Sequence, residues 1–544
     1  MTQQPENLRN TIGKKGVILA VMVVVMASHG AAYARNLSGK TLRIALASEI
    51  ISADPHRHVY TPDILLLSHI YDTLVAQDQD ERLAPSLAVK WAQPTPNTWD
   101  FTLKKDARFH DGSPLRAHDV ASSIQRARSV RDSPVSFGDY LSAIVRTEIL
   151  SPHVLRIHTT DPIPDLPYRL SILKIIPTKA VLASRADFDQ LLQKTGSGPY
   201  QLQQFDRQKQ EIILRASSNY HGPPPRWDTV VLRVIPDDAL RVTALIAGHV
   251  DIIEQLPPAD ASRLVRNPAY TVTSLKPDQL LFLAPDTRKR HSPFVLETGK
   301  RQTNKNPMHD PRVRRAISLA IDRQALTEDS LCGFAEPTDS PLLSSIRPTH
   351  LRPEPERARK LLRDAGWEGG FTVTLHIPED RYASALEIAN TVALQLSRIG
   401  VTVVIEPVDP ELFYRAAGNG EYSLMLLGIA LDIRTPMHPL SSLLGSTQKM
   451  NRTGWQNARM DRLLAAAAEM ENAGERGARE RGARLAEIQA ILDAEAPIMP
   501  LYRQVPLYAM RAHLSMNNTE PRGNLADTIT PLPSPSRTVS DAGH

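Results

Sequence analysis

Two histidine-aspartate pairs stand close together in the sequence, His110-Asp111 and His118-Asp119. An imidazole beside a carboxylate can transfer protons or help to bind a metal ion. The first pair, however, falls where an expected strand meets a turn at Asp111-Gly112, and histidine and aspartate at such a junction usually hold the turn by hydrogen bonds. We therefore predict a structural role for these side chains, not a catalytic one.

Other histidines could begin a metal site. His56 and His58 flank Arg57 and would share one face of an extended segment. Two histidines fall short of the three or four ligands of a zinc site. The Met-His pairs at 308–309 and 437–438 stand beside prolines in expected loops. We predict no metal site from these residues.

The motifs of common enzyme classes are absent from the sequence. It has no nucleophile elbow, phosphate loop, zincin helix or dinucleotide fingerprint. Gly196-Ser197-Gly198-Pro199 lacks the Lys-Ser or Lys-Thr of a phosphate loop, so a turn is the better interpretation. Cys332 is the only cysteine, which excludes an intramolecular disulfide and a CxxC site. We predict no catalytic residue and no cofactor.

The composition is that of a globular chain long enough for two or three lobes, with 544 residues, 42% apolar and 23% charged. The first 34 residues hold three basic residues and one acidic residue, so removing them lowers the net charge from +5 to +3. This small, dispersed charge argues against a nucleic-acid partner.

The beginning of the chain has the pattern of an export signal. Arg9, Lys14 and Lys15 precede an apolar run at 17–27, and Ala32-Tyr33-Ala34 has the small-x-small form of a cleavage site. The apolar run is 11 residues long, whereas a helix needs about 20 to span a membrane, so an uncleaved anchor is the weaker interpretation. We predict a signal peptide at 1–34, cleaved after Ala34, and a periplasmic protein.

Hydrophobic periodicity predicts an α/β protein. Alternation predicts strands at 41–46 and 98–103, and helical spacing predicts helices at 118–130, 310–321 and 355–365. The stretch 463–494 is also mainly helical, with an interruption expected at Gly474 and Gly477. A strand at 371–376, a helix at 382–398 and a strand at 401–405 form a βαβ unit, and a further buried strand is expected at 422–429. Ligands of such sheets usually bind at the carboxyl ends of the strands.

Several motifs then occur in a family order. They are Thr98-Trp99-Asp100-Phe101-Thr102-Leu103, Ala107-Arg108-Phe109-His110-Asp111-Gly112, Gly196-Ser197-Gly198-Pro199-Tyr200, Asn219-Tyr220-His221-Gly222, Asp310-Pro311-Arg312-Val313-Arg314-Arg315-Ala316, Ala365-Gly366-Trp367 and Ala496-Pro497-Ile498-Met499-Pro500-Leu501-Tyr502. With these motifs the sequence resembles the peptide/nickel-type (family 5) solute-binding proteins of ABC importers over almost the whole mature chain.

The resemblance implies a type II periplasmic-binding-protein clamshell of two large α/β lobes, with an extra subdomain inserted in the first. Lobe I would comprise 35–79, 180–276 and 490–520, subdomain II 80–179, and lobe III 277–489, before a flexible tail at 521–544. It also implies a monomer that binds a short peptide or similar solute and hands it to a permease driven by a partner ATPase.

The resemblance further suggests ligand residues. In dipeptide-binding relatives an Asp anchors the free amino group and an Arg the terminal carboxylate, and the matching positions are Asp432 and Arg381. In nickel-type relatives a histidine follows the same strand, and His438 has a similar place. Arg suits a carboxylate because it can donate two parallel hydrogen bonds.

Opines, sugars and glutathione-like peptides also stay open as solutes. Two further alternatives remain beside peptide capture. A receptor for nickel or another metal complex would belong to the same family, with the chelator supplying the remaining ligands. An exported hydrolase that uses His110 and Asp111 would belong to a different class of protein.

Overall fold

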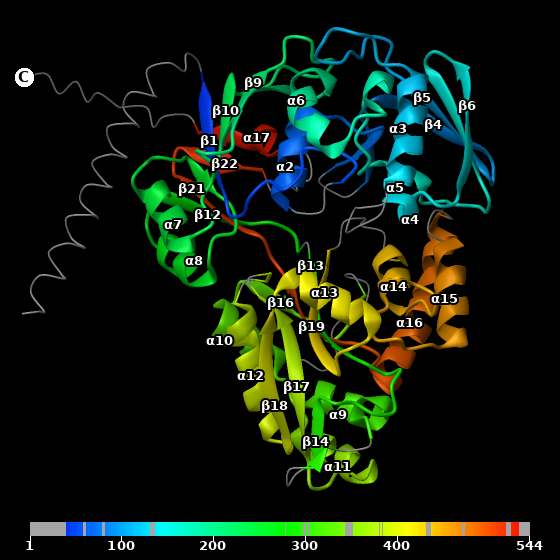
Figure 1. Cartoon of the computed structure of the whole chain (residues 1–544), viewed down its shortest axis with the longest axis vertical. Helices are drawn as coiled ribbons and strands as arrows, with labels where there is room; N and C mark the ends of the chain where they lie inside the picture. Colours follow the sequence, from blue (N-terminus) through cyan, green and yellow to red (C-terminus); the bar gives the residue numbers. More distant parts are fainter. Residues whose placement is uncertain are drawn as a thin grey trace, which may run out of the picture.

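The computed structural model describes residues 40–57, 61–78, 82–130, 137–277, 279–297, 301–302, 305–342, 352–379, 381–382, 384–430, 437–469, 474–517 and 524–532. The expected signal peptide at 1–34 lies outside them. Figure 1 shows two lobes, the upper one built from both ends of the described chain and the lower one from its middle. No helix within the described ranges is long and apolar enough to cross a membrane.

Lobe I is organised around a seven-stranded sheet in the order β12-β21-β11-β1-β10-β9-β8. Its strands are β1 (Thr41–Leu46), β8 (Tyr200–Asp206), β9 (Glu211–Ala216), β10 (Thr229–Val234), β11 (Ile252–Ile253), β12 (Tyr270–Ser274) and β21 (Leu507–Arg511). Strand β1 runs parallel to β10 and β11. Helices cover both faces: α2 (Thr61–Ile70) and α6 (Arg185–Thr195) share a core with Ile44, and α7 (Asp238–Ile246) and α8 (Pro258–Leu264) share one with Ala45.

Subdomain II is built on a four-stranded antiparallel sheet in the order β4-β5-β7-β6. Its elements are β2 (Val75–Gln77), β3 (Leu83–Pro85), β4 (Ala88–Thr95), β5 (Thr98–Leu103), β6 (Ile144–Ser151), β7 (Val154–Thr159), α3 (Ala117–Ser129), α4 (Phe137–Tyr140) and α5 (Leu166–Leu170), followed by the short helix η1 (Thr178–Ala180). Phe101, Leu155 and Ile157 of the sheet pack against Val120 and Ile124 of α3. The subdomain therefore has its own core.

A buried ion pair joins subdomain II to lobe I. Arg126 of α3 donates to both carboxylate oxygens of Asp54, at 2.8 and 2.7 Å, and to His56 Nδ1 at 3.0 Å. Burial by itself would raise the pKa of Asp54, but the hydrogen bonds and charge of Arg126 outweigh burial and hold that pKa below its usual value. Burial and the Arg126 charge lower the pKa of His56 to about 4, so its imidazole is neutral. All three side chains are at least 94% buried.

Lobe III contains an eight-stranded mixed sheet, with β18 paired to β17 beside the path β15-β14-β17-β19-β13-β20-β16. The strands are β13 (Gln279–Pro285), β14 (Val295–Glu297), β15 (Arg301–Gln302), β16 (Ala335–Pro337), β17 (Phe371–Pro378), β18 (Val401–Val408), β19 (Leu424–Ala430) and β20 (Met499–Gln504). The helices are η2 (Pro307–His309), α9 (Pro311–Ala320), α10 (Arg323–Leu331), α11 (Pro355–Asp364), α12 (Ala385–Ser397), α13 (Pro410–Asn419), α14 (Met437–Leu444), α15 (Ala458–Glu469) and α16 (Gly474–Glu495).

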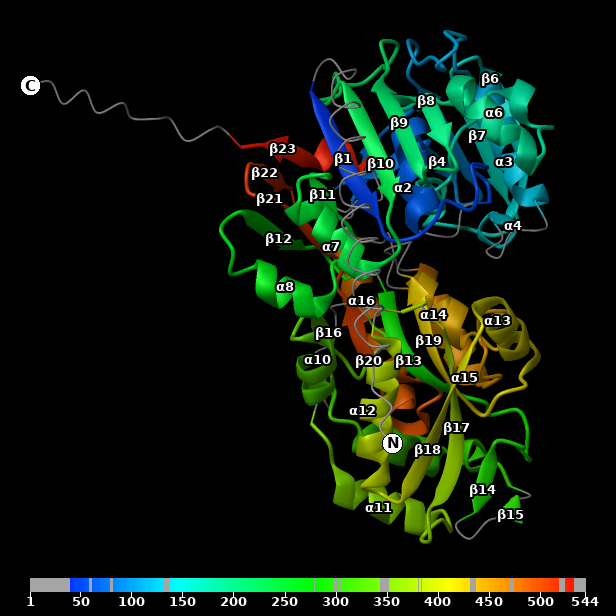
Figure 2. The ribbon, with the colours of Figure 1, turned by 60° about the vertical axis from the view of Figure 1, so that its left-hand side comes forward.

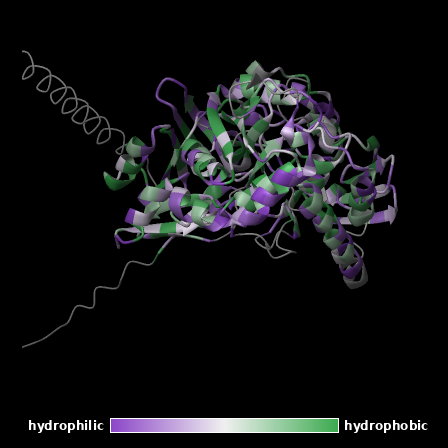
Figure 3. Ribbon diagram, turned by 90° about the horizontal axis from the view of Figure 1, so that it is seen from below, coloured by the Kyte–Doolittle hydropathy of each residue, from purple (hydrophilic) through white to green (hydrophobic). Residues whose placement is uncertain are grey.

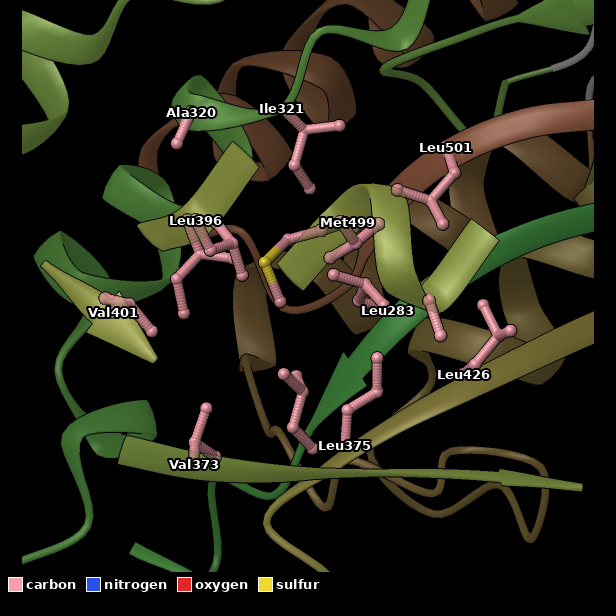
Figure 4. Packing of buried hydrophobic residues seen from close by; sticks show 14 of the residues in the cluster. Leu283, Ala320, Ile321, Val373, Leu375, Leu396, Val401, Leu426, Met499 and Leu501 are labelled. Carbon is pink, nitrogen blue, oxygen red and sulfur yellow. The ribbon is translucent and has the colours of Figure 1, made fainter. Parts of the chain in front are cut away.

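Both faces of this sheet are buried, which explains the nearly continuous apolar sequence of β13 and β19. Leu281 and Leu283 face the core shared with α9 to α12, while Leu280 and Phe282 face the core shared with α13 to α16. Figure 4 shows the first core, where Leu283, Val373, Leu375 and Leu426 of the strands lie near Leu396 and Met499. Figure 3 shows helices that carry both hydrophilic and hydrophobic residues, as one-sided burial requires.

Two chain crossovers join the lobes, at 275–279 and 504–507. Strands β12 and β21 pair in lobe I, up to Ser274 opposite Leu507, and β13 and β20 pair in lobe III from Gln279 opposite Gln504. The amide of Leu275 donates to the Pro506 carbonyl at 3.0 Å. The second crossover thus comes later than the expected boundary at 490, because β20 pairs within the lobe III sheet.

Part of the expected flexible tail is packed against lobe I. Helix α17 (Leu525–Thr528) and strand β23 (Ile529–Pro531) follow β22 (Leu514–Met516), and β23 pairs with β22. The indole N–H of Trp227 lies 3.1 Å from the carbonyl oxygens of Ala526 and Ile529. Burial of Leu525 and Ile529 and these hydrogen bonds attach the segment despite its polar surroundings in the sequence.

Candidate ligand-binding site

The carboxyl ends of parallel strands mark one edge of each large sheet. In lobe III, β17 runs parallel to β18 and β19, so their carboxyl ends lie together at the edge where Gln279 pairs with Ala430 and where the crossovers leave. In lobe I, β12 ends at the edge shared with the carboxyl ends of β1, β10 and β11. Figure 2 shows these two edges on the sides of the lobes turned toward each other. Ligands of α/β sheets bind at such edges.

The sequence-predicted ligand residues all follow strands that end at this edge of lobe III. Arg381 comes three residues after β17 and has an exposed side chain. Asp432, two residues after β19, lies outside the described residues. His438 is in α14, within the described backbone, but its side chain is not described.

Two tyrosines meet at the same edge. The hydroxyl of Tyr382 lies 2.9 Å from that of Tyr414 on α13, and it accepts a hydrogen bond of 2.8 Å from the Gly428 amide of β19. Tyr382 is only 5% exposed, and Tyr414 is half-buried. Burial is the first cause that raises the pKa of Tyr382, so its phenol stays protonated. This pair was not predicted from the sequence, because its members are 32 residues apart and come from different elements.

Guanidinium groups lie over both phenol rings. The Arg381 carbon Cζ is 5.8 Å from the centre of the Tyr382 ring, and that of Arg452 is 5.9 Å from the Tyr414 ring. Arg452 also donates to the Tyr414 carbonyl at 2.9 Å. Both distances suit cation–π attraction. Two arginine side chains therefore lie beside the phenol pair.

A buried carboxyl group lies at the opposing edge of lobe I. Glu254 follows β11, and its Oε1 accepts a hydrogen bond of 3.0 Å from the Ala47 amide just after β1. Its other oxygen, Oε2, has no hydrogen-bond partner among the described residues. Burial raises the pKa of Glu254 to about 7, against the opposing effects of the Ala47 amide and the Arg241 charge.

We expect Glu254→Gln to raise the free energy of unfolding at pH 8 by about 1–2 kcal/mol and to lose this advantage by pH 5.5. At pH 8 the folded wild type holds a buried carboxylate. As the pH falls through about 7, Glu254 takes up a proton in the folded state. In the unfolded state it stays charged down to its ordinary pKa of 4.5. The free energy of unfolding of the wild type therefore rises as the pH falls from 8 to 5.5. The glutamine variant has no such gain.

Urea unfolding at pH 8, 7 and 5.5 measures this difference. The control is Glu49→Gln, because Glu49 is an exposed carboxyl after β1. The free energy of unfolding of Glu49→Gln should differ from that of the wild type by the same amount at all three pH values. A Glu254→Gln difference that does not change with pH would show that Glu254 is not perturbed by burial.

Two of the histidines considered for chemistry, His56 and His110, have structural partners. His110 Nε2 lies 2.9 Å from the Gly198 carbonyl, and the His110 amide donates to Gly196 at 2.7 Å, so this motif joins the turn to the 196–198 loop. Asp111 accepts from Ser113 and pairs with Lys179. His56 Nε2 lies 2.9 Å from the Lys174 carbonyl, while His58 lies outside the described residues. The described ranges contain no group of three or more His, Cys, Asp or Glu that could hold a metal ion.

Comparison with known proteins adds independent findings. Residues 82–451 match the family described as bacterial extracellular solute-binding proteins, family 5 middle. The chain is similar to the glutathione-binding protein GsiB of Salmonella choleraesuis (strain SC-B67), at 24% identity over 485 residues, or 86% of this chain and 89% of that protein. It is similar to the nickel-binding periplasmic protein of Escherichia coli (strain K12), at 27% identity over 57% of this chain and 58% of that protein.

Among solved structures, the fold is similar to that of the periplasmic binding protein DppA from Helicobacter pylori in complex with the peptide STSA. The TM-score is 0.76 at 22% identity, covering 91% of this chain and 98% of that chain. The likeness extends over both lobes, in agreement with the two-lobed architecture described above.

Proposed function

Because the chain belongs to the family 5 bacterial extracellular solute-binding proteins, we propose that it captures short peptides outside the cytoplasm and delivers them to the permease of an ABC importer. One observation carries the proposal: two sheet edges face each other across two short crossovers. Movement of lobes about such crossovers can enclose a polar solute and replace its water by fixed hydrogen bonds. Binding of this kind requires no catalytic group.

The chemistry of a peptide fits the proposed anchors. A free peptide carries an ammonium group at one end and a carboxylate at the other, so it needs one fixed anion and one fixed cation. Arg381 offers a guanidinium for the carboxylate, and we assign the ammonium group to Asp432 from the family resemblance. Two relatives support a peptide, since GsiB is named for glutathione, a tripeptide, and DppA holds the peptide STSA.

A metal complex is the second candidate. The similarity to a nickel-binding periplasmic protein favours it, and His438 would be the protein's ligand to a chelated ion. In this reading the chelator supplies most of the metal's ligands.

Thermal unfolding with added solutes tests the proposal. Dipeptides, tripeptides, glutathione and Ni²⁺ with histidine are added separately, since a solute that binds only the folded state raises the melting temperature. We expect stabilisation by peptides and recovery of each peptide intact by mass spectrometry. Stabilisation by nickel with histidine alone would favour the metal complex, and cleaved peptide would indicate a hydrolase; either result would contradict peptide capture.

We expect Arg381→Ala to weaken peptide binding about tenfold or more, because the terminal carboxylate would lose its charge-assisted hydrogen bonds. Calorimetric titration measures the change. Arg415→Ala on α13 is the matched control, since it removes the same charge from another exposed arginine of lobe III and should bind as the wild type does. Equal losses in both variants would mean that general charge attraction, and not an anchor, explains the role of Arg381.

The proposed route to the periplasm begins with the signal peptide at 1–34, cleaved after Ala34. The mature protein would act as a monomer and present both lobes to a permease, with a partner ATPase driving transport. N-terminal sequencing of protein recovered from the periplasm tests the cleavage position, and a chain that retains its first residues would contradict it.

A further inference from the structure

We propose that the Tyr414 hydroxyl donates a hydrogen bond to the terminal carboxylate of a bound peptide, at the end of a directed chain that runs from the Gly428 amide through the Tyr382 hydroxyl. The inference rests on the proposed function, to which it adds a ligand-contacting residue and the chemical group that this residue recognises. Tyr382 is a positioning residue in this arrangement, because it acts through Tyr414.

The direction of the chain follows from donors and acceptors. The Gly428 amide can only donate, so the Tyr382 oxygen accepts its hydrogen at 2.8 Å. Tyr382 then has one hydrogen of its own to place. Within the described part of the chain, the Tyr414 oxygen at 2.9 Å is the only other hydrogen-bond partner of this hydroxyl. Because a buried hydroxyl is costly to leave unpaired, the Tyr382 hydrogen points to Tyr414.

This direction leaves the hydrogen of Tyr414 without an acceptor among the described residues. Its oxygen already receives the Tyr382 hydrogen, and no described carbonyl or carboxylate accepts from it. The Tyr414 side chain is only half-buried, and its hydroxyl meets Tyr382, which lies four residues after β17. A donor fixed in this way by two others is prearranged for an acceptor atom of the ligand.

The surroundings favour an acceptor that carries negative charge. Arg452 lies over the Tyr414 ring and Arg381 over the Tyr382 ring, at 5.9 and 5.8 Å. Two neighbouring cations make each phenol a stronger donor and attract an anion. Hydrogen bonds to charged groups are also roughly twice as strong as those between neutral groups. A carboxylate therefore suits this position better than an amide carbonyl.

The experiment compares free carboxylates with amides. Dialanine, trialanine and tetraalanine are each used in two forms, with a free C-terminal carboxylate and with a C-terminal amide. Both forms are titrated calorimetrically into the wild type, Tyr414→Phe, Tyr382→Phe and Tyr422→Phe. The last variant is the control, because Tyr422 precedes β19 at the end opposite Gly428 and its hydroxyl makes no hydrogen bond to the described residues. All three substitutions keep the ring and remove only an oxygen.

We expect Tyr414→Phe to weaken binding of the free peptides about tenfold and of the amides by less than about twofold, so that the preference for the carboxylate falls. Tyr382→Phe should lower the same preference by a smaller factor, since it removes the polarising donor. Tyr422→Phe should leave the preference unchanged. A variant that was merely less stable would weaken both forms of the peptide equally.

Two outcomes would overturn the inference. If the wild type binds none of these peptides, the proposed function fails and the inference fails with it. If the wild type binds them and Tyr414→Phe keeps the full preference for the carboxylate, either with unchanged affinities or with free peptides and amides weakened to the same extent, the inference alone is wrong.

Discussion

Replacing Asp54 by Ala is expected to lower the free energy of unfolding by about 3–5 kcal/mol. Asp54 and Arg126 are 1% and 6% exposed, and the two hydrogen bonds between them join lobe I to α3 of subdomain II. Without the carboxylate, the Arg126 guanidinium would remain buried and positively charged beside a neutral His56. Removing one partner of a buried pair leaves this uncompensated charge, which is the main cost.

Urea unfolding at pH 7 measures the loss, and Asp100→Ala is its matched control. Asp100 receives two hydrogen bonds from Arg156, at 2.7 and 2.8 Å, but their side chains are 23% and 32% exposed. Water can solvate Arg156 once its partner is gone, so this control should cost about 0–1 kcal/mol. Equal losses in the two variants would contradict burial as the source of the Asp54 effect.

Gly370→Ala is expected to destabilise lobe III by about 2–4 kcal/mol. Gly370 stands just before β17 with φ of +73°, a conformation that costs energy for a residue with a side chain. An added Cβ would also overlap the carbonyl oxygen of Gly400, which stands just before the paired strand β18. Accommodating the methyl group would separate the two strands where their pairing begins.

The neighbouring glycine provides the control for this substitution. A Cβ on Gly369 would meet no atom within 4 Å, and its φ is not in the left-handed region. Gly369→Ala should therefore change the unfolding midpoint in urea by little. If both alanine variants are as stable as the wild type, the close approach of Gly370 to Gly400 does not constrain the start of the sheet.

The family and the type II fold were predicted from the sequence, and the match over residues 82–451 and the two-lobed structure confirm them. The prediction succeeded where the pattern is local. The βαβ unit appears as β17, α12 and β18, although α12 begins at Ala385, three residues after the expected start. The helical stretch at 463–494, expected to be interrupted at Gly474 and Gly477, is two helices, α15 and α16; the second begins at Gly474 and continues through Gly477.

Other features depended on contacts between distant parts of the chain. The lobe to which the strand at 499–504 belongs depends on the strand with which it pairs. Because it pairs with β13, the boundary at which the chain leaves lobe III moves from 490 to the crossover at 504–507. The segment after residue 521 is rich in proline and serine, so only its contacts with Trp227 show that part of it is packed.

Periodicity located the carboxyl ends of the strands, and Arg381, which was chosen from the family resemblance, lies three residues after β17. The phenol pair could not be predicted, because Tyr382, Tyr414 and Gly428 meet only after three elements have packed. The contact between Tyr382 and Gly428 can be recognised only once the position of Gly428 in β19 is known from the strand pairing. The assignments of Asp432, Arg381 and His438 stay predictions.

The pairing of Gln279 with Gln504 has a consequence for how such proteins can be recombined. The chain passes from lobe I into lobe III and back through two adjacent strands, so the first and last residues of lobe III are neighbours in space. A gene segment that encodes 279–504 can therefore be exchanged as a cassette between relatives by joining the chain at two nearby points. Exchange of this kind would place lobe III of one solute-binding protein against lobe I of another in a single step.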